Sequence, residues 1–318
     1  MTNDQAPAVH SLIPDPRSLA VIIVSWNVRD LLARCLDALF AELDSSSTDA
    51  RVIVVDNASS DGSVAMLRLH YPRVEVIASE KNLGFASGNN LGLNLAKVID
   101  SSQGCEFALL LNPDTEVQPG VIKTLLDVIR SRSDVAVVTS RLAYGDGSFQ
   151  HSAFHFPGLA QLYIELLPAP ARLSESRLNG RYPQRLYTSL QPFEIDHPLG
   201  AVMLLRTEAI RQVGLFDEGF ALYCEEIDWC ARFKEAGWHL LCVPSAHVIH
   251  HSGKSTSQVR VEAFVKLWTA RYRLHTKHPQ FALLWLARRI VTLGMKRRMK
   301  NAPDEIRAAC QAIIDIWQ

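Results

Sequence analysis

The most concentrated set of chemically capable side chains lies in the run Tyr223-Cys224-Glu225-Glu226-Ile227-Asp228-Trp229. Three carboxylates, those of Glu225, Glu226 and Asp228, stand within four residues. The unpaired N–H groups of a helix start also attract acidic residues, which gives the run a structural explanation. Clustered carboxylates, however, raise one another's pKa, and this suits a general base that works near neutral pH. We therefore predict that the run contains a catalytic base.

A second group of side chains has the chemistry to bind a divalent cation. Asp114 follows the apolar run Phe107–Leu111 and a proline, and a carboxylate at such a position suits a cation that bridges a diphosphate. An ordinary turn aspartate explains the residue equally well. Three histidines, at positions 247, 250 and 251, then stand within five residues, before a turn that contains glycine. Their density favours contact with a metal or phosphate over a purely structural role.

Polar residues also follow two shorter apolar runs. The run Leu19–Ser25 continues into Trp26 and Asn27, and the run Val52–Asp56 continues into Asn57-Ala58-Ser59-Ser60-Asp61-Gly62-Ser63. We expect Asp61 and Ser63 to cap the helix that follows. Asp56 closes an apolar strand, where a carboxylate contributes nothing to packing. It is therefore a candidate acceptor for a hydrogen bond from a nucleobase or ribose.

The segment Asn82–Asn90 contains two glycines and three asparagines at a helix start. Such a start permits close approach of a ligand and presents backbone N–H donors, although a generic turn and cap is an equally good explanation. The glycines are four residues apart and do not form a G-x-G-x-x-G fingerprint. Alone, this segment is a weak indication of a binding site.

The elements that must position these residues alternate between strand and helix. Short apolar runs predict strands, and the intervening segments have the apolar spacing of helices. We expect strands at Leu19–Ser25, Val52–Asp56, Val74–Ala78, Phe107–Leu111, Val135–Thr139 and His239–Pro244. The pattern predicts an α/β fold with a largely parallel sheet. Ligands of such sheets bind at the carboxyl ends of the strands, where the candidate residues above are found.

Composition narrows the class of protein. The chain has 318 residues with 33 basic and 33 acidic side chains, and this neutral balance argues against a nucleic-acid partner. Six cysteines without a C-x-x-C pair indicate reduced, packed thiols. The first residues lack the apolar core of a secretory signal, and no apolar run reaches the roughly 18 residues of a membrane span. We expect a cytoplasmic protein, with attachment to a membrane surface left open.

Taken in order, seven segments resemble the inverting family 2 glycosyltransferases of GT-A fold, and most closely their bacterial rhamnosyltransferase-like branch. The segments are VIIVSWN, VVDNASSDGS, NLGFASGNN, LLLNPDTEV, GAVMLLR, VGLFDEGFALYCEEIDWCARFKEAGW and HVIHHSG. The resemblance runs from about Leu19 to Ser255 and is poor between about Phe149 and Glu194. It implies a central, mostly parallel sheet flanked by helices, with a C-terminal helical extension. It also implies transfer of a sugar from a nucleotide-diphosphate sugar to a hydroxyl of a glycan or polyprenyl-linked glycan, with dTDP-rhamnose or a UDP-sugar as donor.

The resemblance also implies a role for each candidate residue. In the donor site, Asp56 would hydrogen-bond the nucleobase, with Ser25 and Asn27 in the same pocket. The other residues expected around the donor are Asn57, Asn82, Gly84, Phe85, Asn89 and Asn112. Asp114 and His250 would hold Mn²⁺ or Mg²⁺. Glu226 would deprotonate the acceptor hydroxyl, with Glu225 and Asp228 in support.

Two positions depart from the family pattern. The metal-binding D-x-D reads Asn112-Pro113-Asp114, with a single carboxylate, so metal binding can be weaker than in relatives with two acids. The E-D-x-D that normally contains the base reads Glu225-Glu226-Ile227-Asp228. The choice of base among Glu225, Glu226 and Asp228 therefore stays open at this point.

The chain is expected to divide into five segments. These are a disordered tail over 1–18, a nucleotide-sugar-binding half over 19–143, an irregular connection over 144–196, an acceptor and catalytic half over 197–258, and a helical extension over 259–318. In the extension, Phe281–Lys300 mixes apolar residues with arginine and lysine. Such a basic amphipathic helix can lie on an anionic membrane surface, or it can pack on the catalytic domain.

Other classes of α/β protein need different sequence motifs. An NAD-dependent oxidoreductase needs G-x-G-x-x-G after the first strand, where this chain has Ser25-Trp26-Asn27-Val28. A nucleotidyltransferase needs a glycine-rich basic loop at the same place. A catalytically inactive nucleotide-sugar-binding protein of the same fold remains as the alternative. It would bind the donor and release no nucleoside diphosphate.

Overall fold

Strand β1 (Leu19–Ser25) shows why the sheet is covered on both faces. The structure is a computed structural model that describes residues 19–100, 104–220, 222–252 and 260–318. In β1, Leu19 and Val21 belong to one hydrophobic core, and Ala20 and Ile22 belong to another. Successive side chains of a strand point to opposite faces, so a run that is apolar at every position needs helices on both sides.

The main sheet has the strand order β3-β2-β1-β4-β11-β6-β12-β5, with β7 beside β6 and β9 beside β12. Strands β3, β2, β1 and β4 are parallel neighbours, β11 is antiparallel between β4 and β6, and β6 and β12 are again parallel. A small separate sheet pairs β8 with β10. The bounds are β2 (Ala50–Asp56), β3 (Val74–Ala78), β4 (Phe107–Leu111), β5 (Thr115–Val117), β6 (Val135–Ala143), β7 (Phe149–Gln150), β8 (Ala153–Phe154), β9 (Phe193–Glu194), β10 (His197–Pro198), β11 (Val202–Arg206) and β12 (His239–His250).

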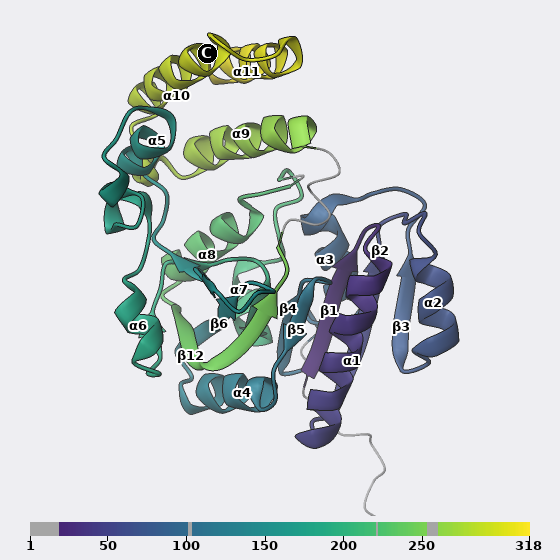
Figure 1. The fold of residues 1–318 in the computed structure, drawn as a ribbon. Coiled ribbons are helices and arrows are strands. Elements are labelled where there is room, and N and C mark those ends of the chain that lie inside the picture. The colour runs from purple at the N-terminus through teal and green to yellow at the C-terminus, as the bar shows by residue number, and fades with distance from the viewer. Residues whose placement is uncertain (1–18, 101–103, 221, 253–259) are drawn as a thin grey trace, which may run out of the picture.

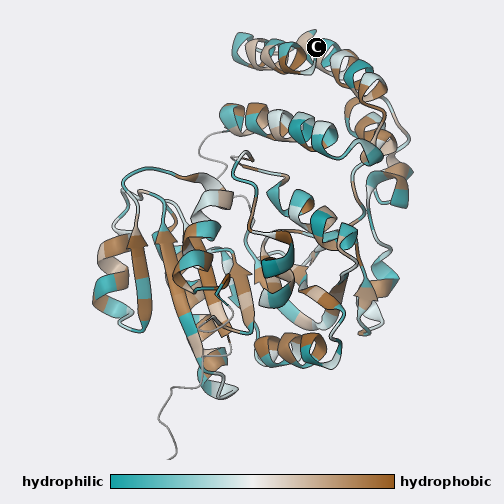
Figure 2. Ribbon diagram, turned by 180° about the vertical axis from the view of Figure 1, so that it is seen from behind, coloured by the Kyte–Doolittle hydropathy of each residue, from teal (hydrophilic) through white to brown (hydrophobic). Residues whose placement is uncertain are grey.

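Helices cover the two faces of this sheet, whose strands are largely hydrophobic (Figure 2). One face packs against α1 (Arg29–Ser45), α2 (Ser63–His70) and α4 (Val121–Ser131). The other packs against α3 (Gly84–Leu95), α7 (Thr207–Val213) and α8 (Glu225–Glu235), with α6 (Gln184–Thr188) at its margin. This layered arrangement confirms the α/β fold that the sequence predicts.

The C-terminal helices form a separate layer with its own core. Figure 1 shows α9 (Arg260–Lys277) between α8 and the pair α10 (Leu284–Met299) and α11 (Asp304–Trp317). Their buried residues include Trp268, Val291 and Trp317, and α5 (Leu159–Leu166) joins this core through Leu162. The predicted helical extension is therefore confirmed. None of the helices in the described ranges is long and apolar enough to cross a membrane.

The segment between residues 144 and 196 is more regular than the sequence suggests. It holds α5, α6, the two-residue strands β7, β8 and β9, and the 3₁₀ turns η1 (Ala171–Leu173) and η2 (Arg177–Asn179). A further 3₁₀ turn, η4 (Pro279–Phe281), precedes α10. Elements this short are set by tertiary contacts, and they lack the length over which an apolar period becomes visible.

Strand β12 is longer than predicted. The expected strand ends at Pro244, whereas β12 continues to His250. Its pairing with β6 shifts register between Val243 and His247, so Pro244 lies at an irregularity where the missing N–H breaks no ladder bond. This continuation places His250 within the sheet.

The expected capping by Asp61 and Ser63 is wrong in detail, because Gly62 is the N-cap of α2 and Ser63 is its first residue. Asp61 lies just before the cap and accepts hydrogen bonds from the backbone N–H and hydroxyl of Ser63. All six cysteines lie in the described residues and are buried with free thiols. The predicted tail over 1–18 lies outside the described residues.

Candidate active site

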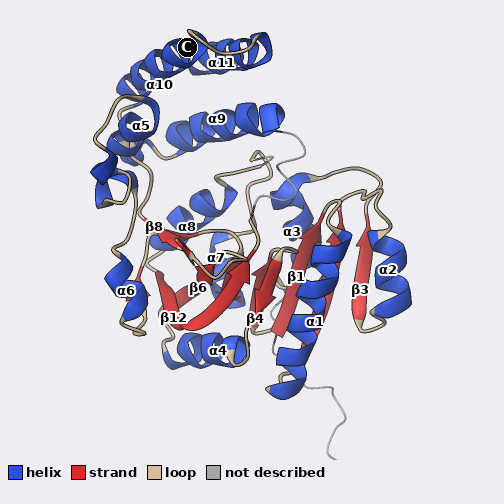
Figure 3. Ribbon diagram, in the orientation of Figure 1, coloured by secondary structure: helices blue, strands red, loops and turns tan. Residues whose placement is uncertain are grey.

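The candidate site lies where the strand order reverses. From β1 the chain builds β2 and β3 on one side of the sheet and then places β4 on the other side of β1. The connections therefore diverge at the carboxyl ends of β1 and β4, which is where open α/β sheets bind ligands. Figure 3 shows the loops that leave β1 and β2 on the side of the sheet nearer to α9. Every predicted site residue belongs to a segment that reaches this edge or faces it.

Two buried polar atoms are left without partners at this edge. Ser25 and Asp56 end β1 and β2 and are paired in register. Asp56 Oδ1 accepts a hydrogen bond from the Ser59 N–H at 2.9 Å. Ser25 Oγ and Asp56 Oδ2 are buried and have no hydrogen-bond partner among the described residues. Buried polar groups are normally paired, so these two atoms indicate the place of a ligand that supplies a donor.

Asn27 and Asn57 hold the loops around these atoms. Asn27 has φ 52°, and its amide oxygen accepts a hydrogen bond from the Ser60 N–H at 2.8 Å. Asn57 donates to the Gly84 carbonyl at 3.0 Å, and its amide oxygen accepts from the Leu83 N–H at 3.4 Å. Both side chains were predicted around the donor. The structure engages both in tying adjacent turns together.

Asparagine side chains also hold the start of α3, through hydrogen bonds to backbone groups. Asn82 accepts a hydrogen bond from the Gly84 N–H at 2.9 Å, and Asn89 donates to the Phe85 carbonyl at 2.9 Å. The second glycine of the motif, Gly88, serves packing: a Cβ there would lie 2.8 Å from a methyl of Val24. Glycine is therefore needed at position 88 because α3 lies in close contact with β1. The expected close approach of a ligand does not explain this glycine.

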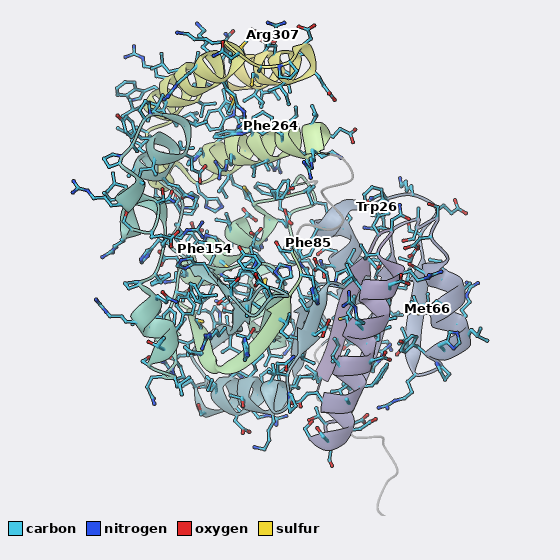
Figure 4. The ribbon with its side chains drawn as sticks, viewed as in Figure 1. Trp26, Met66, Phe85, Phe154, Phe264 and Arg307 are labelled. Carbon is cyan, nitrogen blue, oxygen red and sulfur yellow. The ribbon has the colours of Figure 1, made fainter. Side chains whose placement is uncertain are left out.

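Phe85 extends from the start of α3 toward the middle of the molecule (Figure 4). Its ring meets that of Phe216 edge to face at 6.0 Å between centroids. It also lies beside Gly200, where an added Cβ would be 3.7 Å from Phe85 Cζ and 3.8 Å from Glu226 Cγ. Gly200 thus lies between the donor-side ring and the acidic run, and a side chain there would enter the space between them.

Asp114 and His250 come together as predicted. The last residues of β12 pair with β5, opposite Thr115, and this register sets His250 Nε2 3.4 Å from Asp114 Oδ1. His250 Nδ1 lies 3.1 Å from Gln150 Oε1. With Nδ1 donating to that oxygen, the lone pair of Nε2 faces the carboxylate, which is the tautomer that a metal ligand needs. Asn112 precedes this turn, and its carbonyl accepts hydrogen bonds from the Thr115 backbone and hydroxyl.

The donor set fits a divalent cation that is shared with a substrate. Carboxylate oxygen and imidazole nitrogen both bind Mn²⁺, and Mg²⁺ commonly uses one or two carboxylates with substrate phosphates and water. Across the described ranges, no group of three or more His, Cys, Asp or Glu side chains is arranged to hold a metal. Asp114 and His250 would therefore supply two ligands, and diphosphate oxygens and water the remainder.

The three clustered acids occupy different environments at the start of α8. Glu225 is 5% exposed, and its Oε2 has no hydrogen-bond partner in the described part of the chain. Burial first, and then the Glu226 charge, raise the pKa of Glu225 well above its ordinary value. Glu226 is partly exposed beside Gly200, and burial raises its pKa to about 7. A carboxylate with that pKa is suited to accept a proton at neutral pH.

Asp228 is the exception within the cluster. It is 0% exposed and contacts Arg232 Nε at 3.0 Å, His278 Nε2 at 2.8 Å and Lys277 Nζ at 2.7 Å. Burial opposes its ionisation, but the bonds from His278 and Lys277 and the Arg232 charge outweigh burial, so the pKa of Asp228 lies below its ordinary value. A permanently ionised, fully paired carboxylate is a poor proton acceptor. This environment favours an anchoring role over the catalytic role predicted for it.

Sequence reasoning missed several residues of this site. Gln150 lies in the segment with the poorest resemblance, among polar residues, and no signal in the sequence distinguishes it. Gly200 lies just before β11 and gives no chemical signal in the sequence. Lys277 and His278 belong to the C-terminal extension, 49 and 50 positions from the acid that they contact. No local pattern reveals such contacts.

Unpaired polar groups at the switch point, a carboxylate–imidazole pair and an acid of raised pKa are the features that a nucleotide-sugar transferase of GT-A type needs. The sequence profile of the family described as Glycosyl transferase family 2 matches residues 20–214, and the chain belongs to this family. It is a glycosyltransferase. The matched region ends before α8, so the different roles of Glu225, Glu226 and Asp228 are distinguished by their surroundings in the structure.

Similar proteins agree with this classification. The chain is 28% identical over 244 residues to the N-acetylglucosaminyl-diphospho-decaprenol L-rhamnosyltransferase of Mycobacterium tuberculosis, covering 76% of this chain and 78% of that protein. It is 25% identical over 246 residues to the rhamnosyltransferase WbbL of Escherichia coli, covering 77% and 87%. The solved mannosyltransferase PcManGT of Pyrobaculum calidifontis, in complex with GDP-Man and Mn²⁺, shares the fold with a TM-score of 0.53 and 13% identity, covering 94% of this chain and 69% of that one.

Proposed function

We propose that this glycosyltransferase moves a sugar, with inversion, from a nucleotide-diphosphate sugar to a hydroxyl of a glycan or polyprenyl-linked glycan in the synthesis of bacterial surface polysaccharide. The observation that carries the proposal is the arrangement of three features along one edge of the sheet. These are the unpaired atoms of Ser25 and Asp56, the Asp114–His250 pair, and Glu226 across Gly200. In order they fit a nucleobase, a diphosphate with its cation, and an acceptor hydroxyl.

The donor half is assigned to residues 19–143. Asp56 Oδ2 accepts a hydrogen bond from the base, as the N3–H of uracil or thymine can supply, and Ser25 Oγ contacts the same base. The turns held by Asn27, Asn57 and Asn82 surround the ribose and diphosphate. The rhamnosyltransferases among the relatives favour dTDP-rhamnose as donor, followed by UDP-sugars.

The reaction follows from the positions of the acids, which residues 197–258 supply. The acceptor oxygen forms its bond to the anomeric carbon on the face opposite the nucleoside diphosphate, and the bond to the diphosphate oxygen breaks. Glu226 accepts the hydroxyl proton, and burial raises its pKa to about 7, which suits a base near neutral pH. Asp114 and His250 would hold Mn²⁺ or Mg²⁺, whose charge offsets the negative charge that grows on the leaving diphosphate.

Donor binding by the purified chain tests the proposal. A panel of nucleotide sugars, with and without Mn²⁺ or Mg²⁺, is expected to raise the melting temperature for one donor class, by about 5 °C at a hundredfold excess over its Kd. The shift should grow with metal, and the same donor should release nucleoside diphosphate when a glycan acceptor is present. Stabilisation by dinucleotides alone would contradict a sugar-nucleotide site. Donor binding without any release of nucleoside diphosphate would support the inactive binding protein instead.

We further propose that α10 attaches the enzyme to the cytoplasmic face of an anionic membrane. Leu283, Trp285 and Leu293 are 59%, 56% and 58% exposed, respectively. The exposed cations of the same segment are Arg289, Lys296, Arg297, Arg298 and Lys300. Exposed apolar side chains beside several cations match a surface that presents acyl chains beneath negative headgroups. A polyprenyl-linked acceptor would lie in such a membrane.

Vesicle flotation tests the attachment. The wild-type chain is expected to float with vesicles that contain phosphatidylglycerol at low salt and to remain unbound with phosphatidylcholine alone. Because Trp285 is mostly exposed, Trp285→Ser should leave the fold intact and weaken binding by about tenfold. Leu69→Ser, at a 75% exposed position on α2, is the matched control and should bind as the wild type does. Equal flotation of the two variants would contradict the proposed role of α10.

A further inference from the structure

The backbone immediately before Glu226 has an unusual conformation. Tyr223 and Cys224 have φ values of 71° and 65°, in the left-handed region that residues with a side chain rarely adopt. Cys224 is also the N-cap of α8, so this turn sets where the helix and its acids begin. Two consecutive residues in this region persist only when the surrounding structure holds them.

Lys277, at the end of α9, contacts both sides of this turn. Its Nζ lies 2.7 Å from Asp217 Oδ2, ahead of the turn, and 2.7 Å from Asp228 Oδ1, just after it. The Arg273 guanidinium contacts both oxygens of Asp217, at 3.0 and 2.9 Å. His278 binds Asp228 at 2.8 Å. The ends of the segment that contains the turn are thus held by one helix.

Apolar contacts reinforce these ion pairs. Phe220 is buried and forms a small core with Cys224 and with Ala270 and Leu274 of α9. Over the Phe220 ring lie Arg273, 5.1 Å from the centroid, and Lys277, 5.8 Å from it. Gly219 is also in close contact with the Arg273 guanidinium. The segment therefore packs against α9 as part of a common core.

We propose that α9 is a part of the catalytic site and that Lys277 is a positioning residue for Glu226. The inference rests on the proposed function. By joining Asp217 to Asp228, Lys277 holds the turn at Tyr223 and Cys224 and so keeps Glu226 beside Gly200. Isolated ion pairs at a protein surface contribute little, but Asp228 is fully buried, and a buried pair responds strongly to the loss of a partner. Arg232 and His278 remain bound to Asp228 when Lys277 is replaced, so the fold persists while the turn loosens.

The test compares Lys277→Met, Lys277→Arg and Lys266→Met in the full chain. Lys277→Met is expected to lower kcat by about 10- to 100-fold, since small displacements of a reacting group have effects of this size. Donor affinity should stay within about twofold, because Lys277 contacts Asp217, Phe220 and Asp228, which lie outside the donor half. Lys277→Arg keeps the charge and should recover most of kcat. Lys266→Met removes an exposed lysine of the same helix and should match the wild type.

Hydrogen exchange gives a readout that does not need turnover. In Lys277→Met, amides between residues 217 and 228 should exchange about tenfold faster or more, with no change in 19–100. Unchanged exchange in that segment, or unchanged kcat, would overturn the inference. Equal losses of kcat, donor binding and melting temperature would also overturn it, because they would indicate a merely structural lysine. A wild-type chain that turned over no nucleotide sugar would contradict the proposed function, and the exchange result would then decide the role of Lys277 alone.

Discussion

Replacing Glu226 by glutamine is expected to lower turnover by about 10²–10⁴-fold while donor affinity stays nearly unchanged. The substitution keeps the size of the side chain beside Gly200 and removes its capacity to accept the acceptor proton. The donor groups at Ser25 and Asp56 lie at the ends of β1 and β2 and keep their geometry. Steady-state release of nucleoside diphosphate gives kcat, and the thermal shift with donor gives the affinity.

The pH profile provides a second readout of the same residue. Burial raises the pKa of Glu226 to about 7, and the ionised form is the base. The fraction of active enzyme therefore falls as the pH decreases through that value, so kcat/KM of the wild type should rise with pH and level off above about 7. In Glu226→Gln this limb should disappear from the residual rate.

Two further variants separate the neighbouring acids from the base. Glu208→Gln removes an exposed carboxylate from the first turn of α7 and should leave the rate unchanged. Glu225→Gln removes the buried neighbour and should leave the acid limb near pH 7, since burial raises the pKa of Glu226 and Glu225, whose pKa is raised by the Glu226 charge, is still neutral while Glu226 ionises. Near-normal turnover of Glu226→Gln together with a large loss in Glu225→Gln would assign the base to Glu225.

Replacing Asp114 by asparagine is expected to lower kcat/KM by about 10²-fold or more, which corresponds to about 3 kcal/mol of transition-state stabilisation. The carboxylate lies 3.4 Å from His250 Nε2, and its replacement removes the only charge that the pair offers to a cation. The stabilising effect of Mn²⁺ on the donor complex should disappear in the same variant. Thermal shift with and without a chelator measures this loss independently of turnover.

A related prediction concerns Gln150, whose side chain contacts His250. Gln150→Leu removes the partner that holds the His250 tautomer and should weaken metal binding by about 10- to 100-fold. Asp127→Asn, at an exposed position on α4, serves as the control and should keep the metal response. If the wild type in excess chelator and Asp114→Asn both kept full activity, the assignment of Asp114 and His250 as metal ligands would be wrong.

The strands and the edge of the sheet could be predicted because their causes are local. β1, β3 and β4 have the predicted bounds. The apolar runs of β1 and β4 are buried, as in strands covered on both faces, whereas β3 contains Glu75 and is only partly buried. Parallel strands bring their carboxyl ends to one edge, and Ser25 and Asp56 lie there as neighbours in register.

The orientation and ionisation of the side chains in the site depend on contacts between distant segments. His250 takes its orientation from Gln150, 100 residues away, and reaches Asp114 only because β12 continues past Pro244. Asp228 resembles its two neighbours in sequence, yet His278, 50 residues further on, and Lys277 keep it ionised. The pKa of Glu226 is raised because the fold partly removes its side chain from water beside Gly200. The sequence by itself determined the α/β layers and which residues meet at the sheet edge, because apolar period and strand direction act over a few residues. Only the tertiary structure decided which acid can act as a base and which is an anchor, because desolvation and ion pairing depend on groups that the chain brings together from far apart.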